Sequence, residues 1–138
     1  MSAVTPTNSA AMIRVPVGFT LNFALFGAPL AWSLQLASGY ALSAHACFPA
    51  DIPLVAPVWG SLWWILLGID FAAVSISAAA LLTAFGCRAA WRGTMPQNAG
   101  ERRNRFLAHW SVLVSALFSI AVVFTILMLF IEPVCNYY

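Results

Sequence analysis

The sequence predicts an all-α integral membrane protein, with one membrane domain over residues 1–138 built as a bundle of three transmembrane helices. Hydrophobic residues make up 62% of the chain and charged residues 7%, and the mean hydropathy is +0.89. Soluble proteins usually contain about 25% charged residues. Three apolar stretches, at about 18–47, 56–86 and 106–131, each exceed the roughly 20 residues that cross a bilayer core. Successive segments of alternating polarity, typical of a membrane barrel, are not present in the sequence.

The charges of the connecting segments predict the orientation. The segment at about 87–105, between the second and third helices, contains five of the six basic residues: Arg88, Arg92, Arg102, Arg103 and Arg105. Loops rich in arginine stay on the cytoplasmic side. The first connection carries only Asp51 and the tail only Glu132, whereas Arg14 precedes the first helix. We therefore expect a multi-pass membrane protein with a cytoplasmic N-terminus and, in a bacterial inner membrane, a periplasmic C-terminus. These arginines form no nucleic-acid recognition motif, so no nucleic-acid partner is expected.

The first helix ends in the stretch "YALSAHACFPAD", which resembles a signal-peptidase site. Ala44 and Ala46 precede Cys47 in an A-x-A pattern. A secretory signal, however, has an apolar core of about 7 to 15 residues, whereas no charged residue occurs between Arg14 and Asp51. We therefore expect this stretch to be the outer end of a membrane helix and not a cleavage site.

Each expected helix carries small and polar residues at three- and four-residue steps, which places them on one face. In lipid, such faces let helix backbones approach closely, because no hydrophobic effect drives helices together there. The faces comprise Ala24, Ala28, Ala31, Gln35 and Ser38 in the first helix, Asp70, Ala73, Ser77, Ala80 and Ala84 in the second, and Ser111, Ser115 and Ser119 in the third. Gly68 and Ala72 add a further pair of small residues four positions apart.

Asp70 lies near the middle of the second span, where a carboxylate costs about 2.5 to 3.5 kcal/mol on insertion scales. A rise of about 1.5 Å per residue places Gln35 and Asp70 at similar depths, and Ser119 approaches the same level from the other side. The sequence thus predicts a midplane hydrogen-bonded cluster of Gln35, Asp70 and Ser119. Three roles stay open for Asp70: a neutral link between helices, the partner of a basic residue in another subunit, or the proton or ion site of a small transporter. The transporter has the least support, since no second relay carboxylate or internal repeat accompanies Asp70.

The two histidines do not predict a haem site. His45 lies at the outer end of the first helix and His109 at the cytoplasmic start of the third. A bilayer core of about 30 Å separates these positions, so the two side chains cannot bind one haem. The sequence also lacks a Cys-x-x-Cys-His motif, a phosphate-binding loop and a nucleophile elbow. We therefore expect no cofactor, no catalytic residues and no enzymatic activity.

The cysteines predict a disulfide. Cys47 and Cys135 fall at the outer ends of the first and third helices, whereas Cys87 falls on the cytoplasmic side. The bacterial periplasm is oxidising, so two nearby thiols there pair. Two alternatives remain: both cysteines are free, or they join His45 in a copper site, because thiolates and imidazole suit copper.

Several segments resemble a family of small bacterial membrane proteins encoded near haem-copper cytochrome c oxidase genes. They are "GAPLAWSLQLASGYAL", followed by a cysteine, "RNRFLAHWSVLVSALFSI", and "EPVC" near the C-terminus. The resemblance covers most of the chain from Gly27 to Cys135. It implies a non-catalytic accessory subunit or assembly protein of a respiratory membrane complex, a cytochrome c oxidase, with oxidase subunits as partners. A copper-handling assembly factor and a small transporter are the alternative functions.

Overall fold

The computed structural model contains three α-helices in sequence: α1 (Val17–Cys47), α2 (Leu62–Ala90) and α3 (Ala99–Ile131). The structure describes residues 17–49, 52, 54, 56–93, 95, 97–131 and 135. Throughout these residues the regular secondary structure is helical, which confirms the all-α prediction. Three charged residues used to predict the orientation, Arg14, Asp51 and Glu132, lie outside the described residues.

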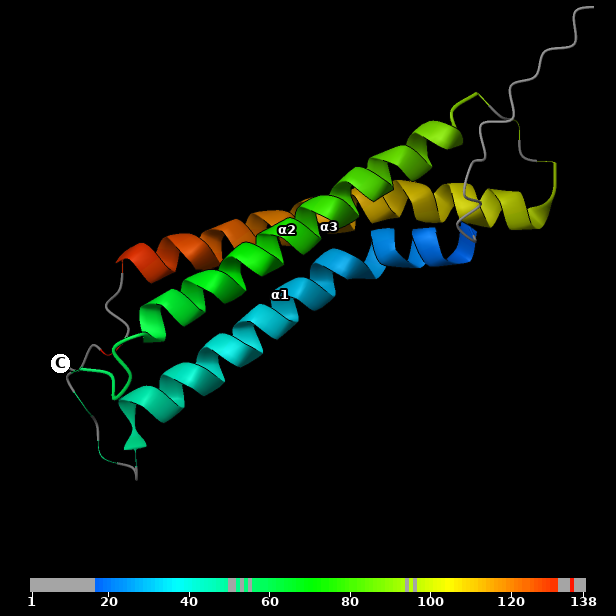
Figure 1. Cartoon of the computed structure of the whole chain (residues 1–138). Helices are drawn as coiled ribbons and strands as arrows, with labels where there is room; N and C mark the ends of the chain where they lie inside the picture. Colours follow the sequence, from blue (N-terminus) through cyan, green and yellow to red (C-terminus); the bar gives the residue numbers. More distant parts are fainter. Residues whose placement is uncertain are drawn as a thin grey trace, which may run out of the picture.

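The three helices pack side by side along their length, with α1 and α3 running in one direction and α2 in the opposite one (Figure 1). One end of the bundle holds Cys47 and Cys135 and is called the disulfide end below. The other end holds the start of α3 and the end of α2 with their arginines, and is called the arginine end. This separation of the arginines from Cys47 and Cys135, with Cys87 on the arginine side, is the arrangement that the sequence predicts.

Two helices have different bounds from those expected, and local hydrogen bonds give the reason. α2 begins at Leu62 and not near 56, because the preceding segment folds back on α1, with the Leu54 and Val58 N–H groups donating to carbonyls in the last turn of α1. α3 begins at Ala99 and not near 106. The side chain of Asn98 accepts a hydrogen bond of 2.9 Å from the Glu101 N–H, and such a cap starts a helix.

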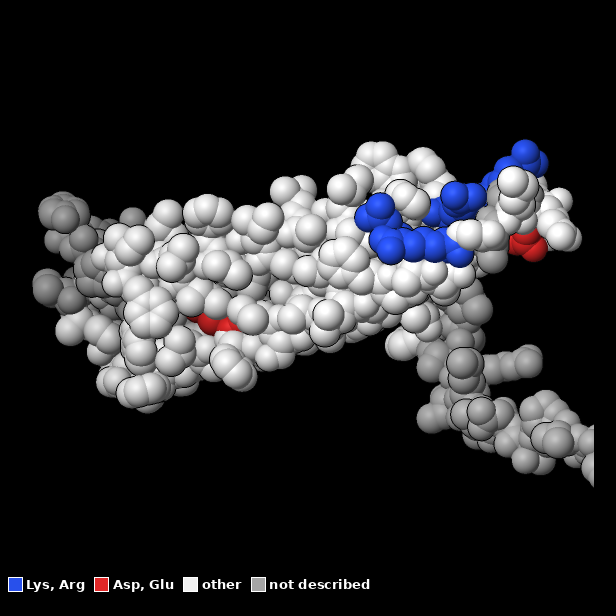
Figure 2. All heavy atoms as spheres, turned by 90° about the horizontal axis from the view of Figure 1, so that it is seen from above, with Lys and Arg blue, Asp and Glu red and all other residues white. Residues whose placement is uncertain are grey.

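The predicted arginine-rich loop is consequently much shorter than 87–105. α2 continues to Ala90, and Gly93 takes the positive φ of 83° that favours glycine in the turn after it. The five arginines lie mostly on helix ends: Arg88 in the last turn of α2, Arg92 in the turn, and Arg102, Arg103 and Arg105 in the first two turns of α3. Figure 2 shows that basic side chains gather at this one end of the molecule.

The core is a stack of small layers, two of which take one residue from each helix. Nearest the arginine end, Ala24, Ala84 and Val112 form a layer. Ala31, Ala73 and Val122 form a second, and Ala46, Leu62 and Leu66 form a third at the disulfide end. Alanine predominates in the first two layers, and small residues of this kind let helix backbones approach closely.

The predicted small-residue faces form these contacts, with few exceptions. Every predicted residue of α2 is buried, as are four of the five in α1, the exception being the partly buried Ser38. On α3, Ser111 and Ser115 are fully buried and Ser119 is partly buried. Gly68 and Ala72 are exposed, and a Cβ atom at Gly68 would meet nothing within 4 Å. The prediction that this pair adds a packing step in the bundle is therefore wrong, because the two residues lie on the outer side of α2.

Two of the helices are long and apolar enough to cross a membrane. They are α2, with a hydropathy of 2.2, and α3, with 2.8, in their most apolar windows. α1 is 31 residues long and contains no Asp, Glu, Lys or Arg, yet it does not reach the same hydropathy. Its serines, Asn22, Gln35 and tryptophan reduce its apolar character.

Candidate functional site

A buried hydrogen bond links the two polar residues that the sequence placed at one depth. The Gln35 side-chain amide on α1 donates to Asp70 Oδ1 on α2, over 2.6 Å. Gln35 is 3% exposed and Asp70 is 7% exposed. This bond confirms two members of the predicted cluster. It joins the helices between the second and third core layers.

Ser119 is not part of this cluster. Its hydroxyl is buried and has no hydrogen-bond partner in the described part of the chain. The polar residue of α3 that lines a cavity with Gln35 and Asp70 is Thr125. Thr125 lies six residues, or roughly 9 Å, further along the helix than Ser119. The prediction for Ser119 is therefore wrong by more than one helical turn.

Ser115 forms an interhelical contact that the sequence does not predict in detail. Its hydroxyl donates a hydrogen bond of 2.6 Å to the backbone carbonyl of Ala24 on α1. Both residues are fully buried. The four-residue serine repeat of α3 indicated a packing face, but the acceptor depends on how α1 and α3 are aligned.

A groove opens beside the Gln35–Asp70 pair, with a cavity volume of about 300 Å³. We call it the Asp70 groove. α1 and α3 provide its walls, and α2 contributes Leu66 and Asp70. The lining residues are Gln35, Leu36, Gly39, Tyr40, Ser43, Leu66, Asp70, Thr125, Met128 and Leu129. Its walls are mainly apolar and its polar groups belong to Gln35, Asp70, Tyr40, Ser43 and Thr125.

The polar groups of the Asp70 groove are incompletely paired. Gln35 Oε1 is buried and accepts no hydrogen bond from the described residues. The described acidic residues are Asp70 and Glu101, of which Glu101 starts α3 beside the arginines. Figure 2 shows the other acidic atoms recessed among uncharged side chains, away from the arginine end. The groove therefore presents hydrogen-bond acceptors and a carboxylate within an apolar surface.

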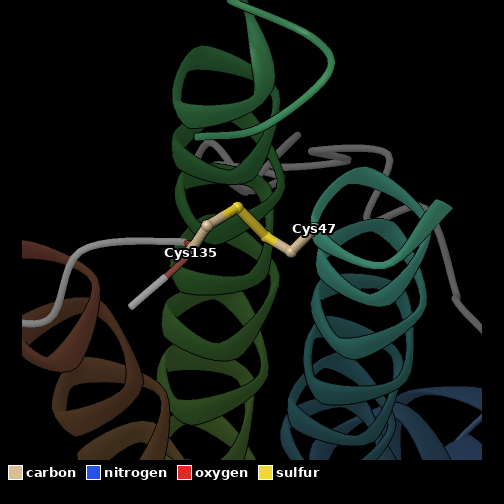
Figure 3. Close-up of a disulfide and its surroundings, with 2 residues drawn as sticks. All are labelled: Cys47 and Cys135. Carbon is tan, nitrogen blue, oxygen red and sulfur yellow. A yellow bond between two sulfur atoms is a disulfide. The ribbon is translucent and has the colours of Figure 1, made fainter. Parts of the chain in front are cut away.

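The disulfide lies at the end of the bundle nearer this groove. Cys47 and Cys135 are joined with a Cα–Cα distance of 5.6 Å, as the sequence predicts. Figure 3 shows the bond between the end of α1 and the chain that follows α3, with α2 seen between the two helices. Both cysteines are buried. The bond therefore ties the C-terminal tail to α1 and holds together the two helices that wall the groove.

The candidate copper ligands do not form a metal site in this structure. The sulfur atoms of Cys47 and Cys135 are bonded to each other, so neither provides a thiolate, and His45 is exposed. Among the described residues, His, Cys, Asp and Glu form no group of three or more able to hold a metal ion.

The two histidines lie toward opposite ends of the bundle. Ser115 of α3 contacts Ala24 of α1, and His109 lies six residues before Ser115, toward the arginine end. His45 lies 21 residues, or roughly 32 Å, further along α1 than Ala24, toward the disulfide end. One haem cannot bridge that distance.

The arginine end contains a second cavity of about 520 Å³ along α3, lined by Arg102, Arg105, Phe106, His109, Trp110 and Leu113. Nearby on α2, Arg88 Nε is buried and has no hydrogen-bond partner among the described residues. Basic and aromatic side chains together at a helix end are typical of a membrane–water interface.

Two further signals for the site are present in the sequence. Asn98 and Glu101 have the spacing of a capping box, which would have located the start of α3. Gly39 and Ser43, four residues apart on α1, would have indicated a small-residue surface beside Gln35. Comparisons with protein-family models, with curated proteins and with solved structures gave no match for this chain.

Proposed function

We propose that this protein is a non-catalytic accessory subunit or assembly protein of a larger membrane complex. The complex we favour is a respiratory cytochrome c oxidase, on the strength of the sequence resemblance. One observation supports association with a partner. The Asp70 groove is an apolar surface that contains the buried carboxyl group of Asp70 and the unpaired amide oxygen of Gln35. A buried polar group without a partner is costly, particularly in lipid, so a second protein that supplies the missing donors stabilises the bundle.

In this proposal all three helices span the bacterial inner membrane. α1 contains no Asp, Glu, Lys or Arg over its 31 residues, which supports its insertion beside α2 and α3. The arginine end faces the cytoplasm, in agreement with the positive-inside rule. The disulfide end then faces the oxidising periplasm, where a disulfide persists.

The exposed surface supports association without requiring a catalytic centre. Large apolar side chains remain exposed on all three helices, including Phe26, Phe71 and Phe124. Lipid covers such side chains, and so do the helices of other subunits. The polar pair in the Asp70 groove distinguishes that face from the purely apolar faces.

Purification of the complex from native membranes tests the proposal. The tagged protein, expressed at its natural level and extracted in a mild detergent, is expected to co-elute with respiratory oxidase subunits that mass spectrometry identifies. An unrelated tagged membrane protein of similar size serves as the control. If the protein elutes alone, as a monodisperse species of its own mass, the proposal is refuted.

The alternative functions have less support. A copper-handling factor that uses His45, Cys47 and Cys135 needs both thiols, and the disulfide removes them unless it is first reduced. Equal copper binding by the reduced wild-type protein and a Cys47→Ser variant would eliminate that function. A transporter with Asp70 as its ion or proton site requires Asp70-dependent flux in proteoliposomes.

A further inference from the structure

We propose that the Asp70 groove receives a transmembrane helix of a partner subunit, and that a lysine or arginine of that helix pairs with Asp70. This inference rests on the proposed function and specifies the chemistry of the partner.

The groove needs hydrogen-bond donors. Gln35 uses its amide N–H to bind Asp70 Oδ1, and its own Oε1 is left buried without a donor. Gln35 is the hydrogen-bond partner of Asp70 in the described chain, so the second carboxylate oxygen also has acceptor capacity. Two neighbouring acceptors, one of them on a carboxylate, are matched by an ammonium or guanidinium group, each of which carries several donors.

The described residues do not supply this cation at the groove. It contains no lysine, and its six basic residues are all arginines. The five that the structure describes lie at the arginine end (Figure 2). Arg14 precedes Gln35 by 21 positions and comes before the start of α1. No described arginine therefore lies beside Asp70, and the proposed basic partner belongs to another molecule.

The depth of the site favours a protein helix over a lipid headgroup. Asp70 lies eight residues after the start of α2 at Leu62, which corresponds to roughly 12 Å along the helix. Gln35 lies twelve residues before Cys47, or roughly 18 Å. The headgroup layer adds only about 5 to 8 Å on each side of the hydrocarbon core. A helix, by contrast, can place a side chain at this depth.

The wall of the groove is suited to close helix contact. Gly39 and Ser43 both line it, and their four-residue spacing places two small side chains on one face of α1. A Cβ atom at Gly39 would meet nothing within 4 Å, so the space beside it is open. Two small residues at this spacing let a second helix approach α1 closely, which brings its side chains within reach of Asp70.

Site-specific photo-cross-linking in native membranes tests the inference. The cross-linker replaces Leu36 or Met128, which line the groove and are 40% and 54% exposed. The depth-matched control is Phe71, which is adjacent to Asp70 in sequence, 75% exposed and outside the groove lining. We expect both groove positions, and not Phe71, to cross-link to one partner helix whose sequenced peptide contains a lysine or arginine.

Charge substitutions then test the ion pair. Asp70→Asn is expected to lower the groove cross-link yield at least about tenfold, whereas Asp70→Glu retains most of it. Neutralising the partner's basic residue is expected to reproduce the loss, and exchanging the two charges is expected to restore the cross-link. Intact disulfide formation and unchanged helical circular dichroism show that each variant is folded.

The possible failures are distinguishable from one another. A groove cross-link that survives Asp70→Asn would show that Asp70 is only a neutral link, and a cross-link to phospholipid would show that lipid occupies the groove; either result overturns the inference. Cross-links to an oxidase subunit from Phe71 alone would overturn the inference and leave the proposed function intact. If no position cross-links to protein and nothing co-elutes, both fail.

Discussion

α1 and α2 approach each other closely at Gly27, and this position offers a sharp test of the packing. A Cβ atom added at Gly27 would lie 2.9 Å from the Cβ of Ala80 and 3.3 Å from the ring of Phe23. Carbon atoms pack best at about 3.5 to 4.0 Å. Phe23 is a side chain that can rotate, whereas Ala80 can move only with its helix. Gly27→Ala therefore requires α1 and α2 to separate by at least about 0.6 Å, the difference between 3.5 Å and 2.9 Å.

This separation affects the core on both sides of Gly27. The position lies between the layer of Ala24 and that of Ala31, so the contacts of both layers lengthen. A gap of 0.5 to 1 Å removes about a quarter to a half of each contact's attraction. Overpacked core substitutions cost about 1 to 3 kcal/mol. We expect Gly27→Ala to destabilise the bundle within this range, although alanine favours a helix by about 0.8 to 1.0 kcal/mol over glycine.

Gly68→Ala is the matched control, because Gly68 is also in a helix and a Cβ atom there meets nothing within 4 Å. It is expected to leave stability unchanged or raise it. The assay is unfolding in detergent micelles, followed by circular dichroism, with each variant measured at the same detergent concentration. Ala80→Gly combined with Gly27→Ala should recover part of the loss, because the colliding methyl group is gone. A Gly27→Ala variant as stable as Gly68→Ala would refute the close approach of α1 and α2.

Three further predictions concern the polar and sulfur contacts. Thiol labelling of native membranes is expected to modify Cys47 and Cys135 only after reduction, and equal labelling before and after reduction would disprove the bond. Replacing both cysteines by serine should destabilise the protein by at most about 4.5 kcal/mol, the chain-entropy value for a separation of 88 residues. Asp70→Asn is expected to leave the isolated bundle folded, because an amide also hydrogen-bonds to Gln35. Asp70→Leu should lower the free energy of unfolding by about 0.6 kcal/mol, the mean for membrane hydrogen bonds. Identical stabilities of the Asn and Leu variants would contradict the Gln35–Asp70 bond. Ser115→Ala should cost a similar amount and more than Ser111→Ala, since the Ser111 hydroxyl bonds within its own helix; the same denaturation assay checks the order.

The buried faces of the helices could be predicted because helical periodicity is a local property. Asp70, Ala73 and Ser77 recur at three- and four-residue steps, and a 3.6-residue period puts them on one side of α2 whatever its neighbours are. The cysteine pairing was predictable for a related reason. Two cysteines at the same ends of parallel helices are brought near each other by topology alone.

The sequence by itself thus determined the helical class, the packing faces and the cysteine pair, whereas only the tertiary structure decided which residues meet across the helices. Depth counted along each helix paired Gln35 with Asp70 correctly, but it misplaced Ser119, because the position of α3 along its axis relative to α1 and α2 is set by interhelical packing and not by the ends of the helices. Thr125, and not Ser119, consequently lies beside Asp70. The Asp70 groove has the same origin: it depends on the relative alignment and separation of three helices, which interhelical packing sets and no single segment encodes.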